Sequence, residues 1–324
     1  MSLVSEGEVM LLNSTNFSYF ILAAYSDTRH FKHLIFLLIL CLYVLIIVSN
    51  LLLIVVICMN RSLHEPMYLF LCSLFVGELW GSTGLFPLLL IQVLSDIHSV
   101  PVPLCFLQVF FIYSYACVEI FNLAAMSYDR YQAICYPLQY NTHMSFKKVA
   151  VFVTVSWLLA FLIVFGTTFL SSSLQLCGNI INNVLCVNYY IVKQSCGDIS
   201  VNNIYGLFAT FLTILVPLSL ILFTYVRIFK VCFSGSKQTR QKALSTCSPH
   251  LASLINFSFG VCFEIVQSRF DMSNVPKILR IFLSLYFLTC QPLFNPMMYG
   301  LKLSKIRQLC KNYFLTCRKF LCSV

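Results

Sequence analysis

The chain has 324 residues, of which 59% are hydrophobic and only 10% are charged, and its formal net charge is +10. Soluble globular domains carry about a quarter charged residues, so this composition excludes a soluble protein and indicates an integral membrane protein. We attribute the basic balance to the loops of a membrane protein, and we expect no nucleic-acid partner.

Seven apolar runs are long enough for a helix to cross a bilayer, which needs roughly 20 residues. They cover His33–Met59, Pro66–Leu94, Val102–Cys135, Phe146–Leu176, Ile199–Val226, Ala243–Val266 and Ile281–Leu301. The third run is long enough for two helices, but no turn signal divides it. We therefore predict an all-α, seven-helix bundle over residues 31–301. A segment at 1–30 precedes it, and a tail at 302–324 begins with a short amphipathic helix.

Lysine and arginine residues predict the orientation of this bundle. They are concentrated after the first, third and fifth runs and in the tail after the seventh. Because cytoplasmic loops carry an excess of these residues, the tail is predicted to be cytoplasmic and the N-terminus extracellular. The first 30 residues lack the pattern of a cleavable signal peptide. They contain two predicted glycosylation sites, Asn13 and Asn16.

Cysteines are unevenly distributed across the predicted membrane. Four lie on the extracellular side: Cys105, Cys177, Cys186 and Cys196. An even number in an oxidising compartment indicates two disulfides, and three pairings are open at this point. Three others lie in the basic tail, where palmitoylation and free thiols are alternatives: Cys310, Cys317 and Cys322.

A few charged residues lie within or at the ends of the apolar runs. Glu78 and Glu119 lie deep in the second and third runs, where an acid is costly unless it is protonated, paired or bound to a cation. Asp129, Arg130 and Tyr131 lie at the end of the third run, where charges cost little. Alone, this trio fits a snorkelling ion pair at the interface better than a functional device.

Five motifs in order resemble those of rhodopsin-like G-protein-coupled receptors and, more narrowly, of odorant receptors. They are Leu63–Leu71, Met126–Tyr140, Thr224–Tyr225, Lys242–Leu251 and Pro292–Tyr299. Together with Asn50 they extend over nearly the whole chain. Three residues depart from the usual pattern, Ser49 for glycine, Glu78 for aspartate and Pro249 for serine. The chain also lacks the Trp-x-Pro of helix six, as odorant receptors generally do.

The resemblance implies a receptor without catalysis, which couples to the olfactory stimulatory G protein and raises cyclic AMP. Arg130 would pair at rest with Asp129 and with groups at the base of helix six, such as His250 or Thr246. Asn295 and Pro296 would give helix seven either a deformable joint or a static kink, because proline removes a backbone donor. The implied coupling residues are Asp129, Arg130, Tyr131, Tyr225, His250, Asn295, Pro296 and Tyr299.

The family also implies a buried ion site in the bundle. It gathers Asn50, Glu78, Glu119 and Asn295 around a shared proton or a cation such as sodium. Two separately neutralised acids are the alternative.

By the same resemblance, a small odorant binds in the outer half of the bundle, between helices three, five, six and seven. The implied lining is Ile112, Tyr113, Ala116, Cys117, Tyr205, Ala209, Thr213, Val261, Ile265 and Arg269. This mostly apolar set suits small ligands held by shape. Ile112 stands where aminergic receptors carry an aspartate, which disfavours an amine anchored there.

Arg269 resembles a residue of the class I, or fish-like, odorant receptors, many of which respond to carboxylic acids. A guanidinium suits a carboxylate ligand. A surface ion pair with Asp271 or Asp198 is the alternative reading of this residue.

The family pairs Cys105 with Cys186, which leaves Cys177 with Cys196 and fixes the second extracellular loop as a lid. It also implies the plasma membrane of olfactory neuron cilia. Two other classes stay open. A non-olfactory rhodopsin-like receptor would share the scaffold, and tissue expression would separate it. A transporter or channel predicts related halves, and no internal repeat is visible. An enzyme is not expected, because the sequence has no Ser/His/Asp set or metal-ligand cluster at membrane depth.

Overall fold

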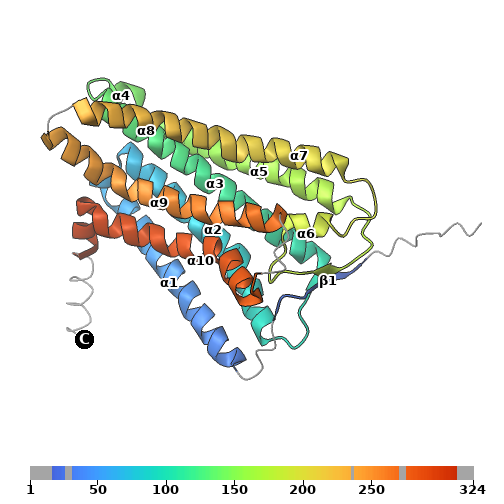
Figure 1. Cartoon of the computed structure of the whole chain (residues 1–324). Helices are drawn as coiled ribbons and strands as arrows, with labels where there is room; N and C mark the ends of the chain where they lie inside the picture. The colour runs from blue at the N-terminus through green and yellow to red at the C-terminus, as the bar shows by residue number, and fades with distance from the viewer. Residues whose placement is uncertain (1–16, 26–30, 235–236, 270–274, 312–324) are drawn as a thin grey trace, which may run out of the picture.

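The structure, a computed structural model, describes residues 17–25, 31–234, 237–269 and 275–311, apart from the side chains of 239–240, 242–246, 265–269, 277–278 and 280. Seven long helical segments form one bundle in this part of the chain (Figure 1). They are α1 (Lys32–Met59), α2 (Pro66–Leu94), α3 (Val102–Cys135), α5 (Phe146–Ser172), α7 with η2 and α8 (Ser200–Thr210, Phe211–Leu215 and Val216–Ser234), α9 (Lys237–Arg269) and α10 (Lys277–Lys302). Residues 304–311 are also helical.

Five of these segments are long and apolar enough to cross a membrane by length and composition. They are α1, α2, α3, α5 and the fifth segment from Ser200 to Ser234. Their outward faces carry large exposed apolar side chains such as Leu38, Leu162 and Leu222. A bilayer covers such surfaces, whereas water would make them costly.

Several helices run beyond the apolar runs in the sequence. The fifth segment continues from Val226 to Ser234, and α9 begins at Lys237 rather than near Ala243. Hydropathy locates only the part of a helix that crosses the hydrocarbon core, and the polar turns beyond it stay helical. Conversely, α5 ends at Ser172, a few residues before the predicted end at Leu176.

A short sheet and a short helix gather at one end of the bundle, which we call the disulfide end. The strands are β1 (Tyr19–Leu22), β2 (Ser99–Pro101) and β3 (Ile180–Ile181), and the helix is α6 (Asn188–Val192). β1 lies in the middle, antiparallel to β2 and parallel to β3. The opposite end, which we call the Arg130 end, carries η1 (Arg61–Leu63) and α4 (Tyr140–His143), as the position of α4 opposite β1 and α6 shows (Figure 1).

Helix α3 occupies the centre of the bundle, where it contacts α2, α5, α8 and α9. Its residues are buried along most of its length, and Tyr115 is fully buried. A helix surrounded on several sides can hold polar side chains only where neighbours satisfy them. This position gives α3 the residues that line the sites described next.

Candidate functional site

A cavity of about 420 Å³ lies between α3, α5, α7, η2, α9 and α10, and residues 185–192 of the disulfide end also border it. Seven of the residues that the sequence assigns to a ligand site line it: Ile112, Tyr113, Ala116, Cys117, Ala209, Thr213 and Val261. Phe287 and Leu288 of α10 add further apolar wall. Such a volume falls within the range of small-molecule sites, about 300–1,000 Å³.

One other predicted lining residue with a described side chain, Tyr205, is not found in this wall. Tyr205 lies on α7, but its hydroxyl donates to the carbonyl of Ile163 on α5 at 2.9 Å, which holds its side chain between those helices. The side chains of Ile265 and Arg269 lie outside the described residues. Two predictions rest on Arg269, the anion anchor and the likeness to the class I branch. Both therefore stay predictions.

The sequence reasoning missed several polar residues that line the cavity. Glu264 lies one turn after Val261 on α9, and Asn202 and Asn203 lie on α7. A signal for Glu264 was available. It is an acid inside the sixth apolar run, and an ionisable residue in a membrane helix is a functional candidate by default. Its spacing of three from Val261 also puts both residues on one face.

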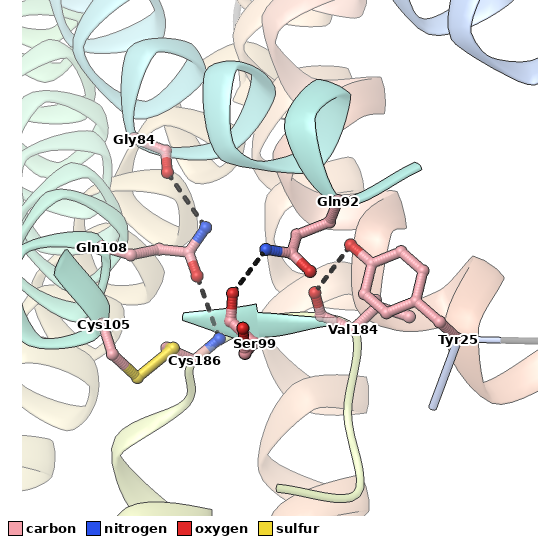
Figure 2. Close-up of a disulfide and its surroundings, with 8 residues drawn as sticks. All are labelled: Tyr25, Gly84, Gln92, Ser99, Cys105, Gln108, Val184 and Cys186. Carbon is pink, nitrogen blue, oxygen red and sulfur yellow. Dashed lines mark hydrogen bonds between the residues drawn. A yellow bond between two sulfur atoms is a disulfide. The ribbon is translucent and has the colours of Figure 1, made fainter. Parts of the chain in front are cut away.

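The disulfide end is tied to the top of α3 by covalent and polar contacts (Figure 2). Cys105 is bonded to Cys186, and the amide of Cys186 donates to Gln108 Oε1 at 3.0 Å. Gln108 in turn donates to the carbonyl of Gly84 on α2 at 3.2 Å. A second disulfide, Cys177–Cys196, lies within the same loop. These pairs are the ones that the family resemblance implies.

The N-terminal strand is part of this lid. The Tyr25 hydroxyl donates to the carbonyl of Val184 at 3.2 Å, and the Tyr25 ring stacks on His98 (Figure 2 shows the first contact). Burial raises the pKa of Tyr25 above its ordinary value, so its hydroxyl stays a donor. At the exposed start of α7, the hydroxyl and amide of Ser200 hold the pKa of Asp198 below its ordinary value. The Tyr25 contact joins the N-terminal segment to Val184, which precedes the cavity residue Leu185.

A buried polar cluster lies in the core between α2, α3, α9 and α10. The side-chain amide of Asn295 donates to Glu119 Oε1 at 2.9 Å and also to Glu78 Oε1. Gln291 donates to the same Glu119 oxygen at 2.9 Å, and Tyr115 donates to Glu78 Oε2 at 2.7 Å. Both carboxylates are fully buried. The two acids therefore share one amide donor, while the predicted proton or cation between them stays a prediction.

Asn50, the fourth predicted member, makes different contacts. Its amide donates to the carbonyls of Ile46 and Pro292, each at 2.9 Å. Its Oδ1 and the Oε2 of Glu119 are buried and have no hydrogen-bond partner among the described residues. The unpaired Oε2 of Glu119 is the kind of oxygen that a proton or a hard cation such as sodium would satisfy. The described residues contain no group of three or more His, Cys, Asp or Glu side chains placed to hold a metal.

At the Arg130 end, Arg130 is ion-paired with the buried carboxylate of Asp129. Asp129 also accepts a hydrogen bond from the hydroxyl of Tyr140 on α4 at 2.8 Å. Burial and the neighbouring Asp129 raise the pKa of Tyr140. Tyr131 is half-buried, and its hydroxyl donates to that of Tyr136 at 3.3 Å.

The expected contact between Arg130 and His250 is not found among the described side chains. The ring of His250 contacts the carbonyl of Leu123 at 3.0 Å and the hydroxyl of Tyr225. Leu123 lies seven residues before Arg130, which is about 10 Å along α3, so His250 contacts α3 about two turns away from Arg130. The side chain of Thr246, the other expected partner, lies outside the described residues.

Helix α10 contributes the remaining predicted switch residues. Pro292 and Pro296 both lie inside it, and Asn295 accepts from the hydroxyl of Ser253 on α9 at 2.6 Å. Tyr299 is buried, with its ring edge-on to Phe75 of α2. The predicted glycosylation sites Asn13 and Asn16 and the tail cysteines Cys317 and Cys322 lie outside the described residues.

A family model described as olfactory receptor matches residues 39–317 of the chain. The chain belongs to the olfactory receptor family. Human olfactory receptor 10A6 is 34% identical over 89% of this chain and 92% of its own length. Human olfactory receptor 1P1 is 33% identical over 90% and 88%, and mouse olfactory receptor 1E16 is 32% identical over 93% and 96%.

Membership in the family confirms three predictions made from the sequence. The all-α, seven-helix bundle, a multi-pass membrane protein and the absence of enzymatic activity all agree with this olfactory receptor family. The family also supports the general role of an odorant receptor of the G-protein-coupled class.

Proposed function

We propose that this olfactory receptor binds a small odorant in the 420 Å³ cavity and, at its Arg130 end, activates a stimulatory heterotrimeric G protein that raises cyclic AMP. The observation that carries the proposal is the cavity itself. It lies between helices that also bear the candidate switch, and most of its wall is apolar. Such walls bind small ligands through shape and dispersion, with few polar contacts.

The contacts at the two ends of the bundle support a mechanism for transmission. α9 contributes Val261 to the cavity, His250 to the contact with Tyr225, and Ser253 to the contact with Asn295. A ligand that moved α9 would therefore strain its bonds to α8 and α10. We propose that outward movement of the α9 base frees Arg130 to meet the G protein, and that Asn295 and Pro296 let α10 adjust.

The buried acids have a place in this proposal. Glu78 and Glu119, with Asn295, would hold a proton or sodium ion that favours the resting packing of α2, α3 and α10. A ligand can shift a two-state equilibrium only by its differential affinity for the two states. We also propose residues 1–30 and 302–324 as the extracellular segment and cytoplasmic tail, and olfactory cilia as the location.

The test uses the full-length receptor in cells with a cyclic-AMP reporter and a panel of odorants. Wild type should respond to at least one odorant, and deleting the stimulatory G protein should abolish the response. Arg130→Ala should lose cyclic-AMP signalling while it still binds the odorant. Arg61→Ala, which removes an exposed arginine after α1, serves as the control. An Arg130→Ala receptor that signals normally would contradict the assigned switch.

A further inference from the structure

The proposed function gives no role to one ionisable side chain in the cavity wall. Glu264 is the single charged side chain among the described residues that line the cavity. It is half-buried on α9, five residues before that helix ends at Arg269, which is about 7.5 Å along the helix axis. The carboxylate thus lies in the part of the cavity towards the disulfide end.

The carboxylate of Glu264 has no protein partner in the described part of the chain. Ion pairs there join Lys32 to Asp96, Arg130 to Asp129 and Lys305 to Glu65. No hydrogen bond to Glu264 is found among the described side chains either. An ionised carboxylate without a compensating charge is costly in apolar surroundings and within a membrane span. A cationic ligand would supply the charge that the wall lacks.

The remaining walls suit the body of such a ligand. Ile112 and Ala116 of α3 and Phe287 and Leu288 of α10 give apolar surface for a hydrocarbon chain or ring. The described lining residues include no lysine, arginine or histidine that would repel a cation. A volume of about 420 Å³ limits the ligand to a small molecule.

We propose that the cavity accepts a small protonated amine, whose ammonium group pairs with Glu264 and whose hydrocarbon part packs on α3 and α10. This inference rests on the proposed function, because it names the ligand class of the same cavity. The anchor is on α9, so the isoleucine at position 112, which disfavours an amine held from α3, does not oppose it. An alkylamine is protonated at neutral pH, as the lysine side chain is.

The test measures binding apart from signalling. Purified full-length receptor is titrated with hexylamine, octylamine and benzylamine, and with hexanol, octanol and benzyl alcohol as neutral partners of matched shape. Ligand-induced rises in melting temperature give the Kd values. Glu264→Gln keeps the side-chain shape and removes the charge. The variant loses the hydrogen bond between the ammonium group and the charged carboxylate. The Kd for amines should therefore rise about 10- to 100-fold, while that for the alcohols stays unchanged.

Two further variants make the result decisive. Asp198→Asn removes an acid at the same end that does not line the cavity, and it should keep the wild-type Kd for amines. If Glu264→Gln cannot be purified folded, Glu264→Asp keeps the charge and should keep the preference for amines over alcohols. Wild type without amine binding, unchanged amine binding in Glu264→Gln, or equal weakening for amines and alcohols would each overturn the inference.

The two proposals can fail separately. Amine binding that depends on Glu264 in purified receptor, without a cyclic-AMP response to those amines in cells, would support the anchor and contradict the proposed signalling. A cyclic-AMP response to neutral odorants alone, without amine binding, would support the proposed function and overturn the anchor.

Discussion

Two acids are buried in this receptor because neighbouring side chains replace the water they lose. Glu78 and Glu119 share the amide of Asn295, and Gln291 and Tyr115 provide one further donor to each. Burying a carboxylate is tolerated when such donors surround it. Removing one donor leaves an unpaired buried oxygen and lowers the stability of the folded receptor. The strength of each donor can therefore be measured one residue at a time.

Tyr115→Phe is the cleanest test at this scale. It removes the hydroxyl that donates to Glu78 at 2.7 Å but keeps the ring that packs on Phe287. We expect a loss of about 1–3 kcal/mol in stability, because a fully buried oxygen loses a donor. The readout is the melting temperature of purified receptor. Tyr128→Phe on the same helix, whose hydroxyl has no hydrogen bond among the described residues, should melt like wild type. Equal melting of both variants would contradict this role.

Sequence reasoning reached the cavity residues of α3 and missed others for a physical reason. Ile112, Tyr113, Ala116 and Cys117 follow helical spacing, and all four line the cavity. On α7 the resemblance also implied Tyr205, whose hydroxyl bonds to α5 instead. Spacing gives the face of one helix, but the neighbour that a long side chain reaches depends on how the helices pack.

At the scale of elements, the sheet at the disulfide end could not be read from the sequence. β1 has four residues, and its partners lie about 80 and 160 positions further along the chain. Such pairing leaves no local pattern beyond the alternation of buried Phe20 and Leu22 with exposed Tyr19 and Ile21. Hydropathy and motifs, by contrast, were enough to predict the helices, because each helix carries a long apolar surface.

Phe20→Ala tests whether this strand holds the N-terminal segment on the lid. Phe20 is fully buried, and its loss should cost about 3–5 kcal/mol of local packing. The neighbouring amides of Ile21 and Leu22, which donate to Asn179 and His98 carbonyls, should then exchange hydrogen at least about tenfold faster. Hydrogen exchange read by mass spectrometry gives the measurement. Ile21→Ala, at an exposed position, should leave exchange nearly unchanged, and similar acceleration in both variants would argue against a packed strand.

For the whole molecule, the sequence predicted seven helices but not how closely they approach. α2 meets α3 through glycines, since an added Cβ at Gly81 would meet the ring of Tyr115 and one at Gly84 would meet the Cβ of Phe111. The absence of a side chain at these points lets the two backbones come together. Their contact in turn sets the position of α3, which carries cavity residues at one end and Arg130 at the other.

Gly84→Ala tests this arrangement of the bundle. The new Cβ would lie closer to Phe111 Cβ than real Cβ atoms lie, and Phe111 Cβ cannot swing away because it is fixed to the backbone of α3. α2 and α3 must therefore separate, at a cost of about 1–3 kcal/mol, which exceeds or offsets the gain of up to about 1 kcal/mol in helix propensity. We expect a lower melting temperature and less receptor at the cell surface.

Gly300→Ala is the matched control. It gains the same helix propensity, but its new Cβ meets its nearest neighbour, Leu53, at an ordinary 3.8 Å, so it should melt at or slightly above the wild-type temperature. A Gly84→Ala receptor that is as stable as Gly300→Ala would show that the α2–α3 contact yields without cost, and the glycines would then have no part in positioning α3.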